Sequence, residues 1–130
     1  AKAWSLWEGR TATLRPNQDV VDSFTEPHRA LSLARIEAHY FVNNAFLEEN
    51  QILRDAHKLA DIPGVIVHGR YDVICPLDNA YMLHKAWPGS ELNIIREAGH
   101  ASRELGIVDA LIRATNDMAK ELGERPDQSA

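Results

Sequence analysis

The sequence predicts an α/β protein in which a helical first part precedes a β-α-β-α unit with two parallel strands. The first 61 residues carry helical patterns, whereas Val65–Val67 and Leu92–Ile95 are short apolar runs typical of buried parallel strands. A helical stretch separates the two runs, as the crossover between parallel strands requires. We therefore divide the chain into a helical part (1–61), a β-α-β-α part (62–122) and a polar tail (123–130).

Helices are expected in the first part over residues 2–8, 16–23, 27–41 and 50–60. Gly9 is expected to end the first of them. Pro27 suits the first position of the third helix, where its missing N–H is not needed. Asn43 and Asn44 break that helix, and the side chain of Asn50 is expected to cap the fourth.

In the second part, a helix is expected from Pro76 to Trp87, with "WPGSE" as the turn into the second strand. A last helix is expected over Gly106–Leu122. Two strands alone leave hydrogen-bonding edges unpaired on both sides. The chain is thus expected to supply two edge strands to a larger sheet.

Composition narrows the function classes. Of the 130 residues, 45% are hydrophobic and 25% charged, and the formal charge is −5. This balance is ordinary for a globular protein and argues against nucleic-acid or anionic-membrane binding. No apolar run approaches the roughly 20 residues of a membrane span. Cys75 is the only cysteine, which fits a reducing compartment such as the cytoplasm. The chain begins without methionine and is expected to be a piece of a longer protein.

Asp72 and His100 follow the first and second predicted strands at similar offsets. Loops from the carboxyl ends of adjacent parallel strands meet at one edge of the sheet. A carboxylate there accepts the Nδ1 proton of the imidazole and leaves Nε2 free as a base. Taken singly, the aspartate is equally explained by backbone hydrogen bonding in a loop and the histidine by a surface position. Their joint placement favours an acid–base pair.

Several segments together resemble a known family. The stretches "IPGVIVHGRYDVICP", "LHKAWPGSEL" and "EAGHAS", in this order, and "WSLWEG" and "ARIEAHYF" before them, resemble the C-terminal part of bacterial proline iminopeptidases (prolyl aminopeptidases). These are serine peptidases of the α/β-hydrolase fold. The resemblance implies that residues 1–61 are a portion of the helical cap domain. Residues 62–122 would then be the C-terminal part of the hydrolase core.

The resemblance implies that Asp72 and His100 are the acid and the base of a Ser-Asp-His triad. In this fold the serine comes first in the chain, within a G-x-S-x-G turn. No such pattern occurs in the 130 residues. The chain alone is therefore expected to be inactive, and no metal or organic cofactor is implied.

Glu8 and Glu37 lack a cation one helical turn away, so the usual surface ion pair is not available to them. An unpaired carboxylate among apolar neighbours is unfavourable. The pattern alone leaves open that both face solvent or pair with distant arginines. The resemblance implies instead that they bind the amine of the N-terminal proline of a peptide substrate.

Other candidates are weaker. Cys75 is better explained as a helix entry than as a nucleophile beside His100. The remaining histidines show no metal-ligand spacing. Trp4, Trp7 and Tyr40 are expected to belong to the core rather than to contact a ligand.

Three functions remain in competition. The first is a serine exopeptidase that releases N-terminal proline. The second is another cap-bearing α/β-hydrolase, of the esterase or epoxide hydrolase type. The third is a truncated, non-catalytic module. If the chain exists alone, it is expected to self-associate, because its first strand would otherwise expose a hydrogen-bonding edge.

Overall fold

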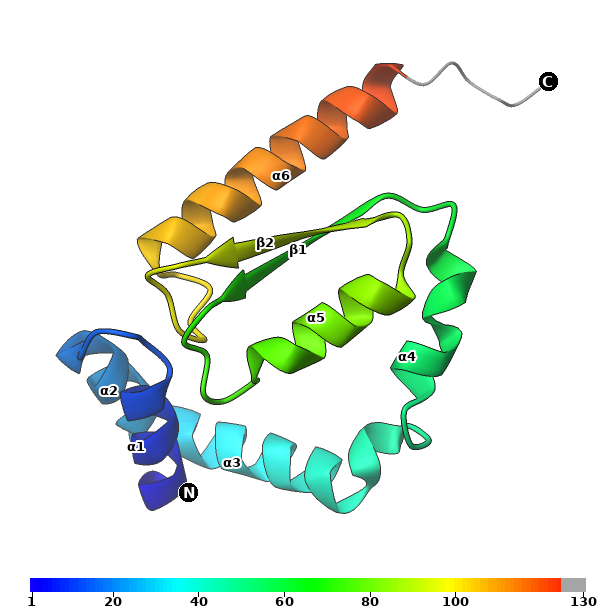
Figure 1. Cartoon of the computed structure of the whole chain (residues 1–130). Helices are drawn as coiled ribbons and strands as arrows, with labels where there is room; N and C mark the ends of the chain where they lie inside the picture. Colours follow the sequence, from blue (N-terminus) through cyan, green and yellow to red (C-terminus); the bar gives the residue numbers. More distant parts are fainter. Residues whose placement is uncertain (125–130) are drawn as a thin grey trace.

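The first half of the chain is helical, as predicted, in a computed structural model that describes residues 1–124 (Figure 1). Its elements are α1 (Lys2–Thr11), α2 (Gln18–Thr25), α3 (Pro27–Val42), the 3-10 turn η1 (Asn44–Phe46), α4 (Gln51–Asp55) and the 3-10 turn η2 (Ala56–Leu59). Helix α3 starts where expected: Pro27 is its first residue, and the Glu26 carboxylate accepts from the N–H groups of His28 and Arg29.

Two expectations about helix ends are wrong. Gly9 lies inside α1 rather than ending it. A Cβ at this position would come within 3.1 Å of Phe24 Cβ and Val21 Cα on α2. The glycine thus permits close packing of two helices. Asn50 precedes α4 but adopts a left-handed conformation (φ 56°), and its side chain makes no capping hydrogen bond.

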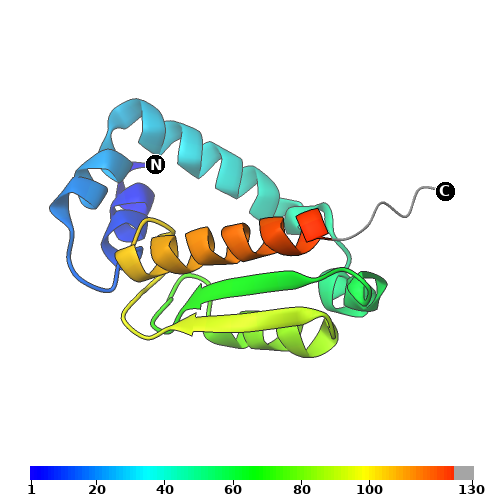
Figure 2. The same ribbon diagram turned by 90° about the horizontal axis from the view of Figure 1, so that it is seen from above.

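The second half is the predicted β-α-β-α unit. It consists of β1 (Gly64–Gly69), α5 (Leu77–Ala86), β2 (Ser90–Ile95) and α6 (Leu105–Glu124). The strands pair in parallel, with Gly64 opposite Ser90 and Gly69 opposite Ile95. Helices α5 and α6 lie on opposite sides of the sheet (Figures 1 and 2).

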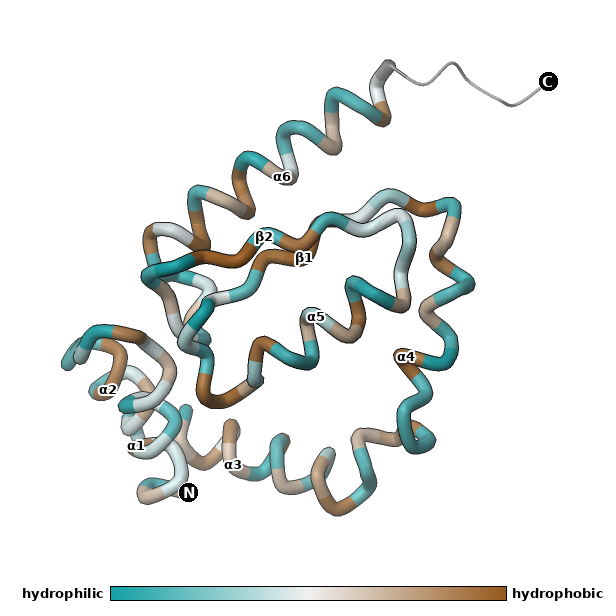
Figure 3. The backbone as a smooth tube through the Cα atoms, viewed as in Figure 1, coloured by the Kyte–Doolittle hydropathy of each residue, from teal (hydrophilic) through white to brown (hydrophobic). Residues whose placement is uncertain are grey.

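Both strands carry apolar stretches (Figure 3), although β2 also contains Glu91 and Asn93. We expected them to be buried on both faces, but most of their residues are only half-buried. The reason is that, within the described residues, each strand has one neighbour and the other edge is open.

Small side chains form the core of the described part. The buried apolar residues are Ala12, Val20, Ala30, Ala56, Ala80, Ala98, Ile107 and Ala110. Large apolar side chains lie outside it. The expectation that Trp4, Trp7 and Tyr40 belong to the core is wrong, since they are 44%, 49% and 49% exposed. Among the described helices, none is long and apolar enough to cross a membrane.

Candidate active site

The loops after β1 and β2 are in direct contact. The backbone N–H of Arg70 donates to the Ile95 carbonyl at 2.9 Å, and that of Tyr71 donates to the Ala98 carbonyl at 3.0 Å. A Cβ at Gly69 would lie 1.9 Å from the Gly99 carbonyl oxygen, so only glycine fits there. This close approach brings the residues that follow each strand to one place.

Asp72 and His100 meet at this place. The His100 Nδ1 lies 2.9 Å from Oδ2 of Asp72. Because an ionised carboxylate only accepts hydrogen bonds, Nδ1 carries the proton, which leaves Nε2 without one in the neutral ring. Within residues 1–124, no hydrogen bond engages Nε2. The imidazole is thus oriented at one nitrogen and available at the other.

The Asp72 carboxylate is held from several sides. The backbone N–H groups of Ile74 and Cys75 donate to its Oδ1 at 3.0 and 2.8 Å. His68 Nε2 lies 3.6 Å from Oδ2 and 2.9 Å from the Cys75 carbonyl oxygen, to which it donates. The Asp72 side chain is only 5% exposed. The loop therefore presents a fixed, desolvated acceptor to His100.

Cys75 lies beside the pair: its backbone N–H donates to Asp72, and its side chain is near enough to Asp72 and Glu8 to interact with their charges. Burial, followed by repulsion from Asp72 and Glu8, raises the pKa of the Cys75 thiol. A raised pKa makes the nucleophilic thiolate rarer at neutral pH. This agrees with the expectation that Cys75 is no nucleophile.

The loop that carries His100 is bonded to the helical part. The backbone N–H groups of His100 and Ala101 both donate to the Ala12 carbonyl, at 2.9 and 2.7 Å. Ala12 directly follows α1, and its own N–H donates to the Glu8 carbonyl at 2.9 Å. Glu8 thus lies one helical turn before Ala12, whose carbonyl accepts the hydrogen bonds from the His100 loop.

Glu8 is a buried carboxylate, 8% exposed. Burial raises its pKa, and the negative charge of Glu37 raises it further, whereas the proximity of His100 lowers it. The structure thus brings Glu8, Glu37 and His100 into one electrostatic neighbourhood. A nearby cation would stabilise the ionised form of Glu8.

Glu37 is half-buried and does have a partner, which the sequence did not suggest. The Trp4 indole N–H donates to its Oε2. The Trp4 ring lies 6.1 Å from that of Trp7 and 6.3 Å from that of Phe41, centre to centre. The Trp4 ring thus borders the Glu37 carboxylate, with Trp7 and Phe41 near that ring, and aromatic faces of this kind suit a cation or an apolar ring.

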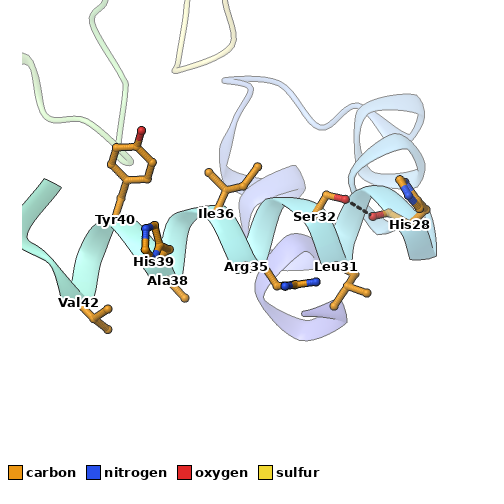
Figure 4. Close-up of a pocket in the computed structure, with 9 residues that line it drawn as sticks. All are labelled: His28, Leu31, Ser32, Arg35, Ile36, Ala38, His39, Tyr40 and Val42. Atoms are coloured by element: carbon orange, nitrogen blue, oxygen red, sulfur yellow. Dashed lines mark hydrogen bonds between the residues drawn. The ribbon is translucent and has the colours of Figure 1, made fainter. Parts of the chain in front are cut away.

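A hollow of about 830 Å³ lies along α3 (Figure 4). Only α3 residues line it, among them Leu31, Ile36 and Tyr40, and neither Asp72 nor His100 reaches it. In Figure 4, Ile36 and Tyr40 point to one side of the helix, and Leu31 and Val42 point to the other. We therefore regard it as the uncovered surface of one helix, separate from the Asp72–His100 pair at the strand ends.

Three contributors to the site were missed by the sequence analysis. Trp4 was expected in the core, His68 was considered only among the histidines without metal-ligand spacing, and Glu104 was not singled out. The strand-end position of His68 was the only signal. Trp4 bonds to a residue 33 positions away, and Glu104 joins Gly99, five positions away, to Leu14, 90 positions away.

An aspartate and a histidine after successive parallel strands, in this chain order, are the acid and base positions of the α/β-hydrolases. The fold agrees with part of that class. Among known proteins, the chain is similar to one kind of enzyme in that class. The chain is 58% identical over 120 residues to a proline iminopeptidase of Xanthomonas citri, which covers 92% of this chain.

Further relatives carry the same name. Identity is 59% over 117 residues to the proline iminopeptidase of Xylella fastidiosa strain 9a5c (89% of this chain) and 44% over 124 residues to that of Arabidopsis thaliana (95% of this chain). No protein-family model matches the chain. The predicted resemblance to part of the proline iminopeptidases is confirmed. The chain spans 38%, 37% and 33% of the length of these three relatives, so it corresponds to part of such a protein.

Proposed function

We propose that this chain supplies the acid, the base and the amine-binding carboxylates of a serine exopeptidase that releases N-terminal proline from peptides. The observation that carries the proposal is the bond between Asp72 and His100 with Glu8 in the same electrostatic neighbourhood. The names of the relatives supply the substrate.

In the proposed reaction, a serine from the rest of the full-length protein attacks the carbonyl carbon of the proline residue. Nε2 of His100 takes the serine proton, and Nδ1 keeps its bond to Asp72, which stabilises the imidazolium. The C–N bond then breaks, and His100 gives that proton to the leaving amine. Water repeats the cycle on the acyl-enzyme and frees proline. No metal or organic cofactor takes part in these steps.

Glu8 and Glu37 are proposed to bind the secondary ammonium of the substrate's proline. Two carboxylates offer four acceptor oxygens, one of which already accepts from Trp4, to its two N–H groups. The positive charge would also offset the burial, and then the repulsion by Glu37, that raise the pKa of Glu8. An internal residue of a peptide has no charged amine. The clamp therefore restricts cleavage to the N-terminus.

The test is hydrolysis of proline and alanine arylamides by the full-length protein, followed by the same assay on residues 1–130. We expect the full-length protein to prefer the proline substrate and the isolated chain to show no turnover, since it holds no G-x-S-x-G serine. A preference for neutral esters with no cleavage of proline arylamide would favour the alternative, an esterase-type or epoxide hydrolase-type enzyme. Turnover by residues 1–130 would contradict the assigned nucleophile.

We further propose that the full-length enzyme is cytoplasmic and that the isolated chain self-associates. In the described part, β1 has β2 on one side and an open edge on the other. Light scattering coupled to size-exclusion chromatography is expected to give a dimer or larger species for residues 1–130. A stable monomer at high concentration would contradict self-association. If residues 1–130 associate and the full-length protein shows no turnover, the alternative of a non-catalytic module would be favoured instead.

A further inference from the structure

Glu104 joins two segments that are distant in sequence. One carboxylate oxygen accepts from the backbone N–H of Gly99 at 2.6 Å, and the other accepts from that of Leu14 at 3.1 Å. Gly99 directly precedes His100, and Leu14 follows the end of α1 by a few residues. Figures 1 and 2 both show the loop before α6 beside the segment that connects α1 and α2.

The Glu104 carboxylate binds these two loops instead of capping the helix that follows it. Glu104 directly precedes α6, a position where side chains often accept from the first N–H groups of the helix. Here the backbone carbonyl of Glu104 accepts from Ile107 and Val108, while the side chain reaches out to the two loops. Charge-assisted bonds to backbone N–H groups are among the stronger hydrogen bonds.

The two loops approach closely at a glycine. A Cβ at Gly99 would lie 3.0 Å from the Leu14 nitrogen and 3.3 Å from the Ala12 carbonyl oxygen. The Ala12 carbonyl also receives the His100 N–H. Glu104 therefore closes a ring of hydrogen bonds between the loop of the proposed base and the end of the helix that carries Glu8.

We propose that Glu104 is a positioning residue that fixes His100 relative to Glu8, and hence the base relative to the bound amine. This inference rests on the proposed function. A displacement of about 1 Å in such a geometry lowers turnover by about 10²-fold. Loss of Glu104 should then reduce kcat much more than it changes KM.

A matched control exists in the same two segments. Arg15 and Glu97 form an ion pair at 3.7 Å, with side chains 85% and 81% exposed. An ion pair so exposed to solvent contributes little to the stability of the fold. Glu97→Gln removes a charge from the loop that leads to His100 without touching the two hydrogen bonds of Glu104.

The experiment compares Glu104→Ala, Glu104→Gln and Glu97→Gln in the full-length protein, with a proline arylamide and a neutral aryl ester as substrates. We expect Glu104→Ala to lower kcat for both substrates about 10- to 100-fold with KM within about threefold. Glu104→Gln keeps one acceptor oxygen, so its kcat should lie between those of Glu104→Ala and the parent. The kcat of Glu97→Gln should equal that of the parent. If Glu104→Ala does not fold, the glutamine variant decides.

The proposal is overturned if the Glu104 variants keep kcat within about twofold of the parent, or if Glu97→Gln loses as much as they do. A parent that hydrolyses the ester but no proline arylamide would contradict the proposed function instead. The ester comparison would still test Glu104, because ester turnover also requires a positioned His100.

Discussion

Asp72 Oδ2 accepts from Nδ1 of His100 at 2.9 Å, although the two residues are 28 positions apart in the chain. The parallel register of β1 and β2 produces this meeting, since it aligns Gly69 with Ile95 at the ends from which both loops depart. The acceptor is held independently of the histidine, because the N–H groups of Ile74 and Cys75 donate to the other carboxylate oxygen. The loop is thus built to orient an imidazole.

The first prediction concerns substrate selection by Glu8. In the full-length protein, Glu8→Gln should lower kcat/KM for proline arylamide about 10- to 100-fold, the value of a hydrogen bond to a charged group. Hydrolysis of a neutral aryl ester should change little, because that substrate has no amine. Steady-state kinetics on both substrates test this, with Glu91→Gln on the exposed face of β2 as the control. Equal losses on both substrates would argue against a clamp.

The second prediction uses the raised pKa of Glu8, which burial and then Glu37 produce. The folded protein binds this proton more tightly than the unfolded chain does. The contribution of Glu8 to the free energy of unfolding therefore declines as pH rises from below the ordinary carboxyl pKa through the raised value. Glu8→Gln removes this dependence. Its Tm relative to the parent should be higher at pH 8 than at pH 4, and a difference that does not vary with pH would contradict the burial of an ionised Glu8.

The third prediction concerns the contact between the two loops. Gly69→Ala would place a Cβ 1.9 Å from the Gly99 carbonyl oxygen and 2.8 Å from that of Ala98. Overpacking of this kind costs about 1–3 kcal/mol or more and should displace the loop that leads to His100. We expect a lower Tm together with a lower kcat.

Gly123→Ala is the matched control, because a Cβ there meets nothing within 4 Å. It should leave activity unchanged and add up to about 1 kcal/mol of helix stability. Thermal melts and kinetics of the two variants decide the matter. A Gly69→Ala enzyme with the parent's Tm and kcat would show that the loops do not pack as described.

Local patterns were sufficient to predict the β-α-β-α order and the meeting of Asp72 with His100, because strand runs and parallel pairing determine both. Helix ends were less predictable. Gly9 was expected to end a helix, but its role depends on contacts with Val21 and Phe24 of the next helix. The bond from Trp4 to Glu37 and the two bonds of Glu104 likewise depend on tertiary contacts that no local spacing indicates.

The exposure of large apolar side chains could not be predicted from local sequence patterns either. Phe41, Val42 and Phe46 are 62%, 80% and 61% exposed in the described structure. An apolar face on a helix predicts burial, but the partner that buries it is supplied by the tertiary or quaternary context. The amphipathic pattern therefore identifies the face without identifying what covers it.

The most direct test of the account is the kcat of Asp72→Asn in the full-length protein with proline arylamide. The amide oxygen can still accept from the N–H groups of Ile74 and Cys75, so the loop should stay folded, while the negative partner of His100 is lost. We expect kcat to fall on the order of 10⁴-fold, with Asp78→Asn, an exposed position in the first turn of α5, matching the parent. An Asp72→Asn enzyme that retains kcat within about tenfold of the parent would contradict the assignment of Asp72 and His100 as acid and base.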